Sequence, residues 1–141
     1  MHVASSKFPA DLESRGTVSN RTRGADGERI AAQYLESRGY RILEYNYRTR
    51  MGEIDLIAKD GVTLVFVEVK ARTNDRFGGP AEAITKAKQA RVARLAQQYL
   101  AVRRLADRLC RFDVVLIRGD DPKTCSIELL TGAFELPLGA S

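Results

Sequence analysis

Acidic side chains and a lysine recur at two-residue spacing in two neighbouring apolar segments of the sequence. Glu53 and Asp55 lie in the segment GEIDLIA, and Glu68 and Lys70 lie in the segment LVFVEVK. Residues two apart in a strand point to the same face, so each segment presents its charged pair on one side. Carboxylate oxygens are preferred ligands of Mg²⁺, and a neighbouring ammonium can hold a water or offset charge on a phosphate. The spacing therefore indicates metal-assisted chemistry on a phosphate group.

A β-hairpin is predicted to bring the two segments together. Residues 53–58 and 63–70 have the composition of strands, and Asp60-Gly61 between them is a strong hairpin signal. A two-residue turn at Asp60-Gly61 places Ile57 opposite Leu64, so that apolar residues match across the hairpin. The same register places all the acids on one face.

In this register Glu53 lies opposite Glu68, and Asp55 is the diagonal neighbour of Glu68. Like charges directly opposite each other destabilise a sheet, and a shared divalent cation accounts for their presence. The alternative is an edge strand on which Glu53, Glu68 and Lys70 form an ordinary ion pair in water. The flanking apolar residues and the second acidic strand favour the cation site.

A further carboxylate is predicted on a helix that precedes the hairpin. Apolar residues at helical spacing predict a helix over 26–38, with Asp26 as its N-cap and Gly39 just beyond its end. Glu28 shares the apolar face of this helix with Ala31, Ala32 and Leu35. A carboxylate in that position is costly to bury unless it is paired or bound to a cation.

The remaining pattern predicts one α/β domain over residues 25–135. Residues 1–24 lack helical or strand periodicity and are predicted to be a poorly ordered tail, and 136–141 a flexible C-terminus. The other predicted elements are strands over 40–47, 112–117 and 125–130, and a helix from 81 or 85 to 101, with an extension or restart to 109. The continuous apolar run over 112–117 predicts a strand that is buried on both faces.

Composition sets the broad class of protein. The chain has 141 residues with 44% hydrophobic and 29% charged residues, which excludes a collagen, a coiled coil and a wholly disordered chain. No apolar run approaches the length of about 18–20 residues that spans a membrane, and no secretory signal is recognisable. Cys110 and Cys125 are expected to be buried, reduced thiols, and the expected location is cytoplasmic. A histidine base is not expected, because His2, in the predicted tail, is the single histidine.

Positive charge is concentrated in one stretch of the chain. The formal net charge is +5, but residues 86–111 hold eight basic residues and one acid, so the rest of the chain is net negative. Lys88 lies on the apolar stripe of the predicted helix and can extend toward the acidic end of the sheet. Arg48, Arg50 and Arg72 bracket the hairpin in sequence and are candidate phosphate contacts. Charge separated in this way favours nucleic acid as the partner.

Taken together, these motifs resemble the YraN-like family of small bacterial proteins, a branch of the restriction-endonuclease-like nucleases whose signature is D…(D/E)-x-K. The resemblance covers about residues 24–135. Its components are Gly27-Glu28, Gly52-Glu53-Ile54-Asp55-Leu56-Ile57, Phe66-Val67-Glu68-Val69-Lys70-Ala71-Arg72, Phe77-Gly78 with Lys88, and Arg111-Phe112-Asp113-Val114-Val115. Each component alone is weak, and their order and separation carry the specificity.

The resemblance implies a restriction-endonuclease-like fold, with a central mixed β-sheet flanked by α-helices. It also implies that Asp55 and Glu68 bind Mg²⁺ or Mn²⁺ and that Lys70 is the catalytic lysine. Glu28 matches the acid that related junction-resolving nucleases carry on their first helix, as a further catalytic and metal-binding group. Glu53 belongs to the family motif and is expected to contact the metal ligands without binding the ion itself.

Three functions remain open on the sequence. The first is a metal-dependent endonuclease that hydrolyses DNA phosphodiester bonds, with branched or structured DNA as a possible substrate class. The second is a nucleic-acid-binding protein that keeps the nuclease fold without turnover. The third is a structural protein that binds another protein. No exposed apolar stripe decides between a monomer and a homodimer.

Overall fold

The computed structural model of the chain describes residues 20–72, 85–105, 107–119 and 123–134, with only the backbone described for 20–25 and 72. Most of the predicted N-terminal tail and the whole of the predicted flexible C-terminus lie outside these residues. Residues 73–84, which follow the hairpin in sequence, also lie outside them.

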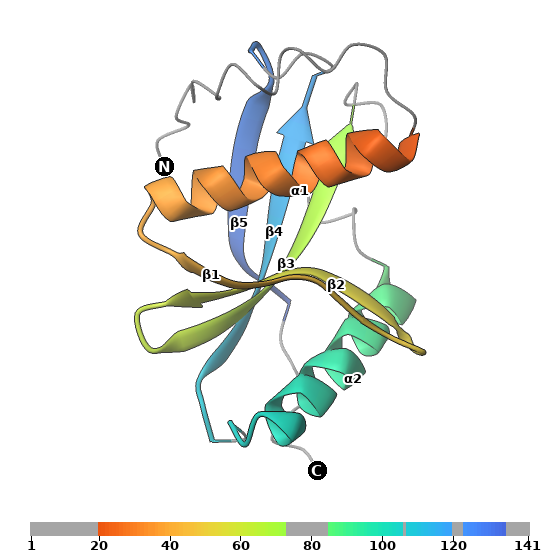
Figure 1. The fold of residues 1–141 in the computed structure, drawn as a ribbon, viewed down its shortest axis with the longest axis vertical. Coiled ribbons are helices and arrows are strands. Elements are labelled where there is room, and N and C mark those ends of the chain that lie inside the picture. The colour runs from red at the N-terminus through yellow and green to blue at the C-terminus, as the bar shows by residue number, and fades with distance from the viewer. Residues whose placement is uncertain (1–19, 73–84, 106, 120–122, 135–141) are drawn as a thin grey trace.

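The described residues form one five-stranded sheet in the order β1-β2-β3-β4-β5, with a helix on each face (Figure 1). The β3 and β4 strands are parallel, and the other neighbouring strands are antiparallel. The elements are α1 (Asn20–Ser37), β1 (Arg41–Thr49), β2 (Gly52–Asp60), β3 (Thr63–Arg72), α2 (Lys86–Val102), β4 (Cys110–Arg118) and β5 (Ser126–Phe134). This confirms the predicted α/β class, a restriction-endonuclease-like mixed sheet flanked by helices.

Helix α1 begins at Asn20, six residues before the predicted start at Asp26. The prediction was wrong there because apolar periodicity reports only the packed turns, and residues 20–24 contain no apolar side chain. The other end is as predicted, since Gly39 has a φ of 94°. The Tyr40 N–H donates to the Leu35 carbonyl at 3.0 Å, which completes a Schellman motif and turns the chain into β1.

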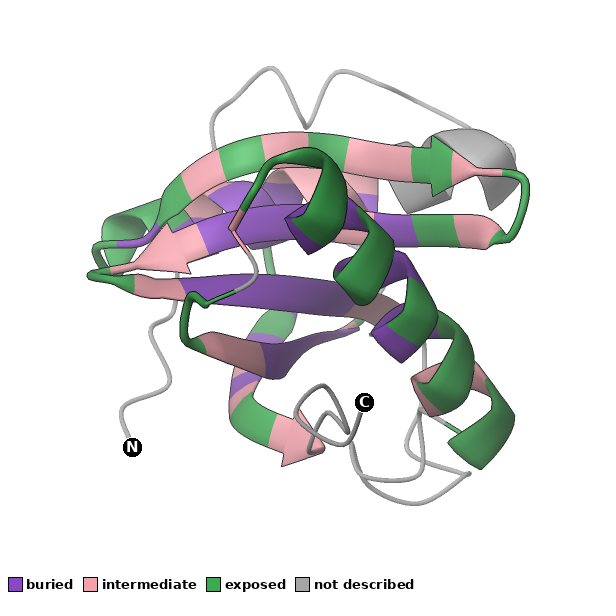
Figure 2. Cartoon of the chain, turned by 90° about the horizontal axis from the view of Figure 1, so that it is seen from below, coloured by how far each residue is buried: buried purple, intermediate pink, exposed green. Residues whose placement is uncertain are grey.

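Two apolar layers hold the helices to the sheet. On the first face, Leu35 of α1 packs in one cluster with Val65, Val67 and Val115. On the second face, Leu95 of α2 packs in another cluster with Leu64, Phe66 and Phe112. The alternation of Leu64 and Phe66 with Val65 and Val67 follows the predicted period of two. Figure 2 shows the matching pattern on α2, which is buried toward the sheet and exposed on its outer side.

The register of the β2–β3 hairpin differs by two residues from the prediction. Ile57 lies opposite Phe66, and the turn residues are Gly61 and Val62. Gly61 has a φ of 62° and occupies the first central position, as in a type II′ turn. Asp60 remains in the strand, where its carboxylate accepts from Arg111 at 3.0 Å. A shift of two residues leaves side chains on their predicted faces, so the acids of β3 keep their orientation.

The predicted extension of α2 to residue 109 is wrong. The helix ends at Val102, Arg104 has a φ of 57°, and the Leu105 N–H donates to the Leu100 carbonyl at 2.8 Å. This is a C-terminal stop built with arginine in the left-handed position that glycine usually occupies. The sequence contains no glycine there, so the usual signal is missing.

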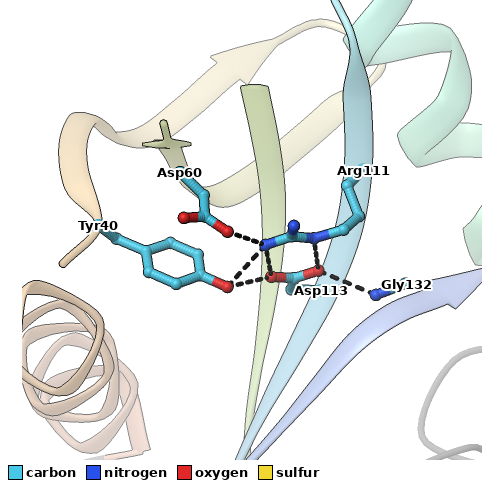
Figure 3. A network of polar contacts seen from close by, with 5 residues as sticks. All are labelled: Tyr40, Asp60, Arg111, Asp113 and Gly132. Carbon is cyan, nitrogen blue, oxygen red and sulfur yellow. Dashed lines mark hydrogen bonds and ion pairs between the residues drawn. The ribbon is translucent and has the colours of Figure 1, made fainter. Parts of the chain in front are cut away.

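Strand β4 is buried on both faces, as predicted, and all its residues from 112 to 117 are buried. One of them is the acid Asp113, which is 1% exposed. Its carboxylate accepts from Arg111, from the Tyr40 hydroxyl and from the Gly132 N–H (Figure 3). This network therefore joins the turn between α1 and β1, the end of β2, and strands β4 and β5.

Two smaller predictions concern the membrane and the cysteines. None of the helices in the described part of the chain is long and apolar enough to cross a membrane. Both cysteines are free thiols, as predicted. Cys125 is buried, whereas Cys110 is only half-buried because it lies at the first position of β4.

Candidate active site

The candidate site forms where β2 separates from β3. The paired residues of these strands extend from the turn to Leu56 and Val67. Beyond that pair, Oδ2 of Asp55 accepts a hydrogen bond from the Val69 N–H at 2.8 Å. A side-chain oxygen thus takes the place of a strand carbonyl. This hydrogen bond fixes Asp55 beside the stretch of β3 that contains Glu68 and Lys70. Ile54 packs in the same cluster as Ile57, so the simple alternation predicted for β2 ends at this point.

Three acids from three elements meet at this opening. Asp55 comes from β2, Glu68 from β3, and Glu28 from the middle of α1. Glu28 and Asp55 lie close enough to shift each other's pKa, and the charge of Glu68 raises the pKa of Asp55. Glu68 is only 7% exposed, so its carboxylate depends on protein partners rather than on water. The sequence-predicted trio of Glu28, Asp55 and Glu68 is therefore brought together.

Two lysines supply the opposite charge. Lys88 Nζ contacts Oε2 of Glu68, and Lys70 Nζ lies 3.8 Å from the same oxygen. Thr85 caps α2 by accepting from the Lys88 N–H at 3.1 Å, which places Lys88 in the first turn facing the sheet. The prediction that Lys88 reaches the acidic end of the sheet is confirmed.

Burial and crowding shift the ionisation of these groups. Desolvation, together with the charge of Glu68, raises the pKa of Asp55 to about 8. Desolvation also raises the pKa of Glu28, although the hydrogen bond from Asn46 opposes the shift. Desolvation and the neighbouring ammonium of Lys88 lower the pKa of Lys70. A half-buried acid with so high a pKa, beside a second carboxylate, is typical of a functional site.

These residues fit a divalent cation. In the described part of the chain, no three His, Cys, Asp or Glu side chains are spaced to hold a metal ion by themselves. Mg²⁺, however, is commonly held by one or two carboxylates, with water and phosphate oxygens completing its shell. Asp55 and Glu68 supply two, and the repulsion that raises the pKa of Asp55 is what a cation would relieve. Glu28 lies behind Asp55 rather than beside Glu68 in this arrangement.

Other predicted site residues lie farther out. Glu53 does not face Glu68, because the register is displaced, and it pairs instead with Arg48 at 3.3 Å in an exposed contact. The negative charge of Glu53 still raises the pKa of Glu28. Arg50 is exposed in the β1–β2 turn. Arg72 ends β3, and its side chain lies outside the described atoms.

Comparison with known proteins places this chain in a family. The family model described as "Uncharacterised protein family UPF0102" matches residues 27–117. A UPF0102 protein of Syntrophus aciditrophicus is 51% identical over 122 residues, which are 86% of this chain and 95% of the relative. One of Moorella thermoacetica is 46% identical over 119 residues, 84% of this chain and 99% of the relative. The chain belongs to the UPF0102 family.

Membership confirms the YraN-like family that the sequence motifs predicted. A third relative, from Nitrosomonas europaea, is 49% identical over 113 residues, which are 80% of this chain and 93% of the relative. The matched region of this UPF0102 protein begins at Gly27 and includes the acids of the opening and both lysines. It ends at Ile117 in β4, so the candidate site lies wholly inside it.

One residue of the site in this UPF0102 protein was missed from the sequence. Asn46 donates from Nδ2 to Oε1 of Glu28 at 2.7 Å, although it lies in the middle of β1. Its φ is 52°, which few residues other than glycine adopt. The available signal was its type, because asparagine is depleted in strands and tolerates the left-handed conformation.

The raised pKa of Asp55 gives a testable dependence of stability on pH. The unfolded carboxyl loses its proton near pH 4, whereas the folded one keeps it until about pH 8. Between these values the folded state binds more protons, so this group makes the free energy of unfolding fall as pH rises. Asp55→Asn is expected to remove this contribution, measured by urea unfolding of the metal-free protein at about pH 5 and about pH 8.

Glu53→Gln provides the matched control, since it removes an exposed acid from the same strand. It is expected to leave the dependence of unfolding on pH as in the wild type. If Asp55→Asn and wild type lose the same stability over this range, the carboxyl of Asp55 is not the buried group described above.

Proposed function

We propose that this UPF0102 protein is a metal-dependent endonuclease that hydrolyses DNA phosphodiester bonds with Mg²⁺ or Mn²⁺. The observation that carries the proposal is the convergence of Asp55, Glu68 and Lys70 at the opening between β2 and β3. Two acids and a lysine on adjoining strands provide ligands for a cation and a group for the attacking water. No other cluster in the described residues combines these two functions.

Each residue has a distinct role in this proposal. Asp55 and Glu68 hold the ion, and the Val69 N–H keeps the Asp55 carboxyl in place. When bound, the ion supplies positive charge that activates water and offsets the charge developing on the phosphate. The lowered pKa of Lys70 leaves its amine unprotonated more often than that of an ordinary lysine at the same pH, so it can orient the water and take its proton. Lys88 pairs with Glu68 in the free protein. Its ammonium can pair with the incoming phosphate instead.

The surface for DNA is proposed to lie on the β1–β2 turn and the first half of α2. Arg48 and Arg50 flank the turn, and Arg91 of α2 packs over Gly52, where an added Cβ would lie 2.9 Å from the Arg91 Cδ. The turn and the helix therefore present their arginines side by side. Such groups contact phosphate oxygens and set the position of a duplex without reading its sequence.

The direct test is cleavage of labelled oligonucleotides by the full chain. Duplex, single-stranded and four-way-junction DNA would each be incubated with Mg²⁺ or Mn²⁺, and products separated on a denaturing gel. We expect cleavage of at least one substrate that requires the ion, and none with Glu68→Gln. Absence of cleavage with either ion on every substrate, or full cleavage by Glu68→Gln, would contradict the proposal.

A DNA-binding protein without turnover is the second candidate. The contact of Lys88 with Glu68 favours it, because an internal ammonium satisfies the carboxylate that a metal ion would use. This candidate predicts binding that weakens steeply with salt and an affinity that Asp55→Asn leaves unchanged. A gel-shift titration at several salt concentrations, run beside the cleavage assay, separates the two candidates.

A further inference from the structure

The backbone of β1 adopts a left-handed conformation at one position. Asn46 has a φ of 52°, although it lies between Tyr45, which pairs with Leu56, and Tyr47, which pairs with Ile54. It therefore lies opposite Asp55 on the neighbouring strand. A strand residue in this region is under strain, and strain of this kind persists only where surrounding contacts enforce it.

The side chain of Asn46 shows what the conformation achieves. Its Nδ2 donates to Oε1 of Glu28 at 2.7 Å, across the gap between β1 and α1. Glu28 is half-buried on the inner side of α1, and the carboxyl of Asp55 is one of its polar neighbours. An uncharged amide donor holds an anion in place without neutralising it, whereas a lysine or arginine would neutralise it.

The left-handed conformation interrupts the side-chain alternation of β1. Tyr45 pairs with Leu56, which packs in the cluster of α1, whereas Tyr47 packs in the cluster of α2, so these residues two apart lie on opposite faces. Asn46 lies between them, and its side chain reaches Glu28 of α1. Asparagine is one of the few residues that combines this conformation with a side-chain donor.

We infer that Asn46 is a positioning residue: it holds the Glu28 carboxylate beside Asp55, and Asp55 is the acid that would bind the cation. The inference rests on the proposed function, because it assigns Asn46 to the same metal site. It predicts that losing the amide weakens cation binding even when the backbone of β1 is preserved. Groups that orient a metal-binding carboxylate typically affect metal affinity by about 10–100-fold when removed.

Asn46→Gly tests this inference in the full-length protein. Glycine adopts the left-handed conformation freely and removes only the donor. Mn²⁺ binding would be measured by isothermal titration calorimetry without DNA, and we expect the dissociation constant to rise about 10-fold or more. Arg104→Gly is the matched control, because Arg104 also has a positive φ but lies beyond α2, and it should leave Mn²⁺ binding unchanged.

A double-mutant cycle distinguishes positioning from a purely structural role. If Asn46 acts through Glu28, Asn46→Gly should have little further effect on Mn²⁺ affinity in a Glu28→Gln background. Equal losses in both backgrounds would overturn the inference, as would an Asn46→Gly protein that binds Mn²⁺ like the wild type.

The outcomes also separate this inference from the proposed function. A wild type that binds Mn²⁺ but cleaves no DNA contradicts the nuclease proposal, while the cycle still decides the role of Asn46. A wild type that binds no Mn²⁺ contradicts both.

Discussion

Lys70→Met is expected to lower the rate of metal-dependent DNA cleavage by about 10²–10⁴-fold, the range typical of a positioned proton-transfer group. Lys70 lies 3.8 Å from the Glu68 carboxylate, and burial lowers its pKa. Methionine keeps much of the length of the side chain and removes the amine. Single-turnover cleavage with saturating protein would report the chemical step without a contribution from product release.

The same variant should retain Mn²⁺ binding. Lys70 is not a ligand, and removing an ammonium beside Glu68 does not weaken attraction for a cation. Lys59→Met is the matched control, because Lys59 is a half-buried lysine on β2 that pairs away from the opening. Cleavage by Lys70→Met at the wild-type rate would show that this lysine does not act on the water.

Arg111→Met is expected to lower the free energy of unfolding by about 3–5 kcal/mol, as for one partner removed from a buried ion pair. Arg111 donates to both oxygens of Asp113, to the Tyr40 hydroxyl and to Asp60 (Figure 3). Asp113 is almost fully buried, so loss of the guanidinium leaves its carboxylate uncompensated. The remaining donors, Tyr40 and Gly132, carry no charge.

Urea unfolding followed by circular dichroism would measure this loss. Arg48→Met is the control, because its ion pair with Glu53 is exposed and should contribute only about 0–1 kcal/mol. A loss of similar size in the two variants would show that the Arg111 network is no more stabilising than a surface pair. The network lies on the α1 side of the sheet, so this result does not depend on the proposed activity.

Local pattern alone determined much of this protein. The alternation of Leu64 to Lys70 assigned faces to β3, the run over 112–117 marked a strand buried on both sides, and Gly39 marked the end of α1. These signals succeed because side-chain direction follows a fixed period within each element. They also singled out Glu28, Asp55, Glu68, Lys70 and Lys88, whose charged or polar side chains were unexpected on apolar faces.

The tertiary structure decided how those residues meet. The pairing of Asp60 with Arg111, far apart in sequence, keeps Asp60 in the strand and moves the turn to Gly61-Val62. The shifted register displaces Glu53 from Glu68, and the bond from the Val69 N–H to Asp55 lies where the two strands separate. Neither contact can be recognised from the local sequence, because register and strand separation depend on partners elsewhere in the sheet.

The same limit applies to Asn46. Its type allowed a left-handed backbone, but the reason to adopt one is the carboxylate of Glu28 on a helix 18 residues earlier. Sequence periodicity describes one element at a time, so it identified the chemistry of the charged residues and the faces they occupy. Which oxygen accepts from which donor, and which acid lies beside which lysine, depended on the packing of α1, β1 and α2 around the opening of the sheet.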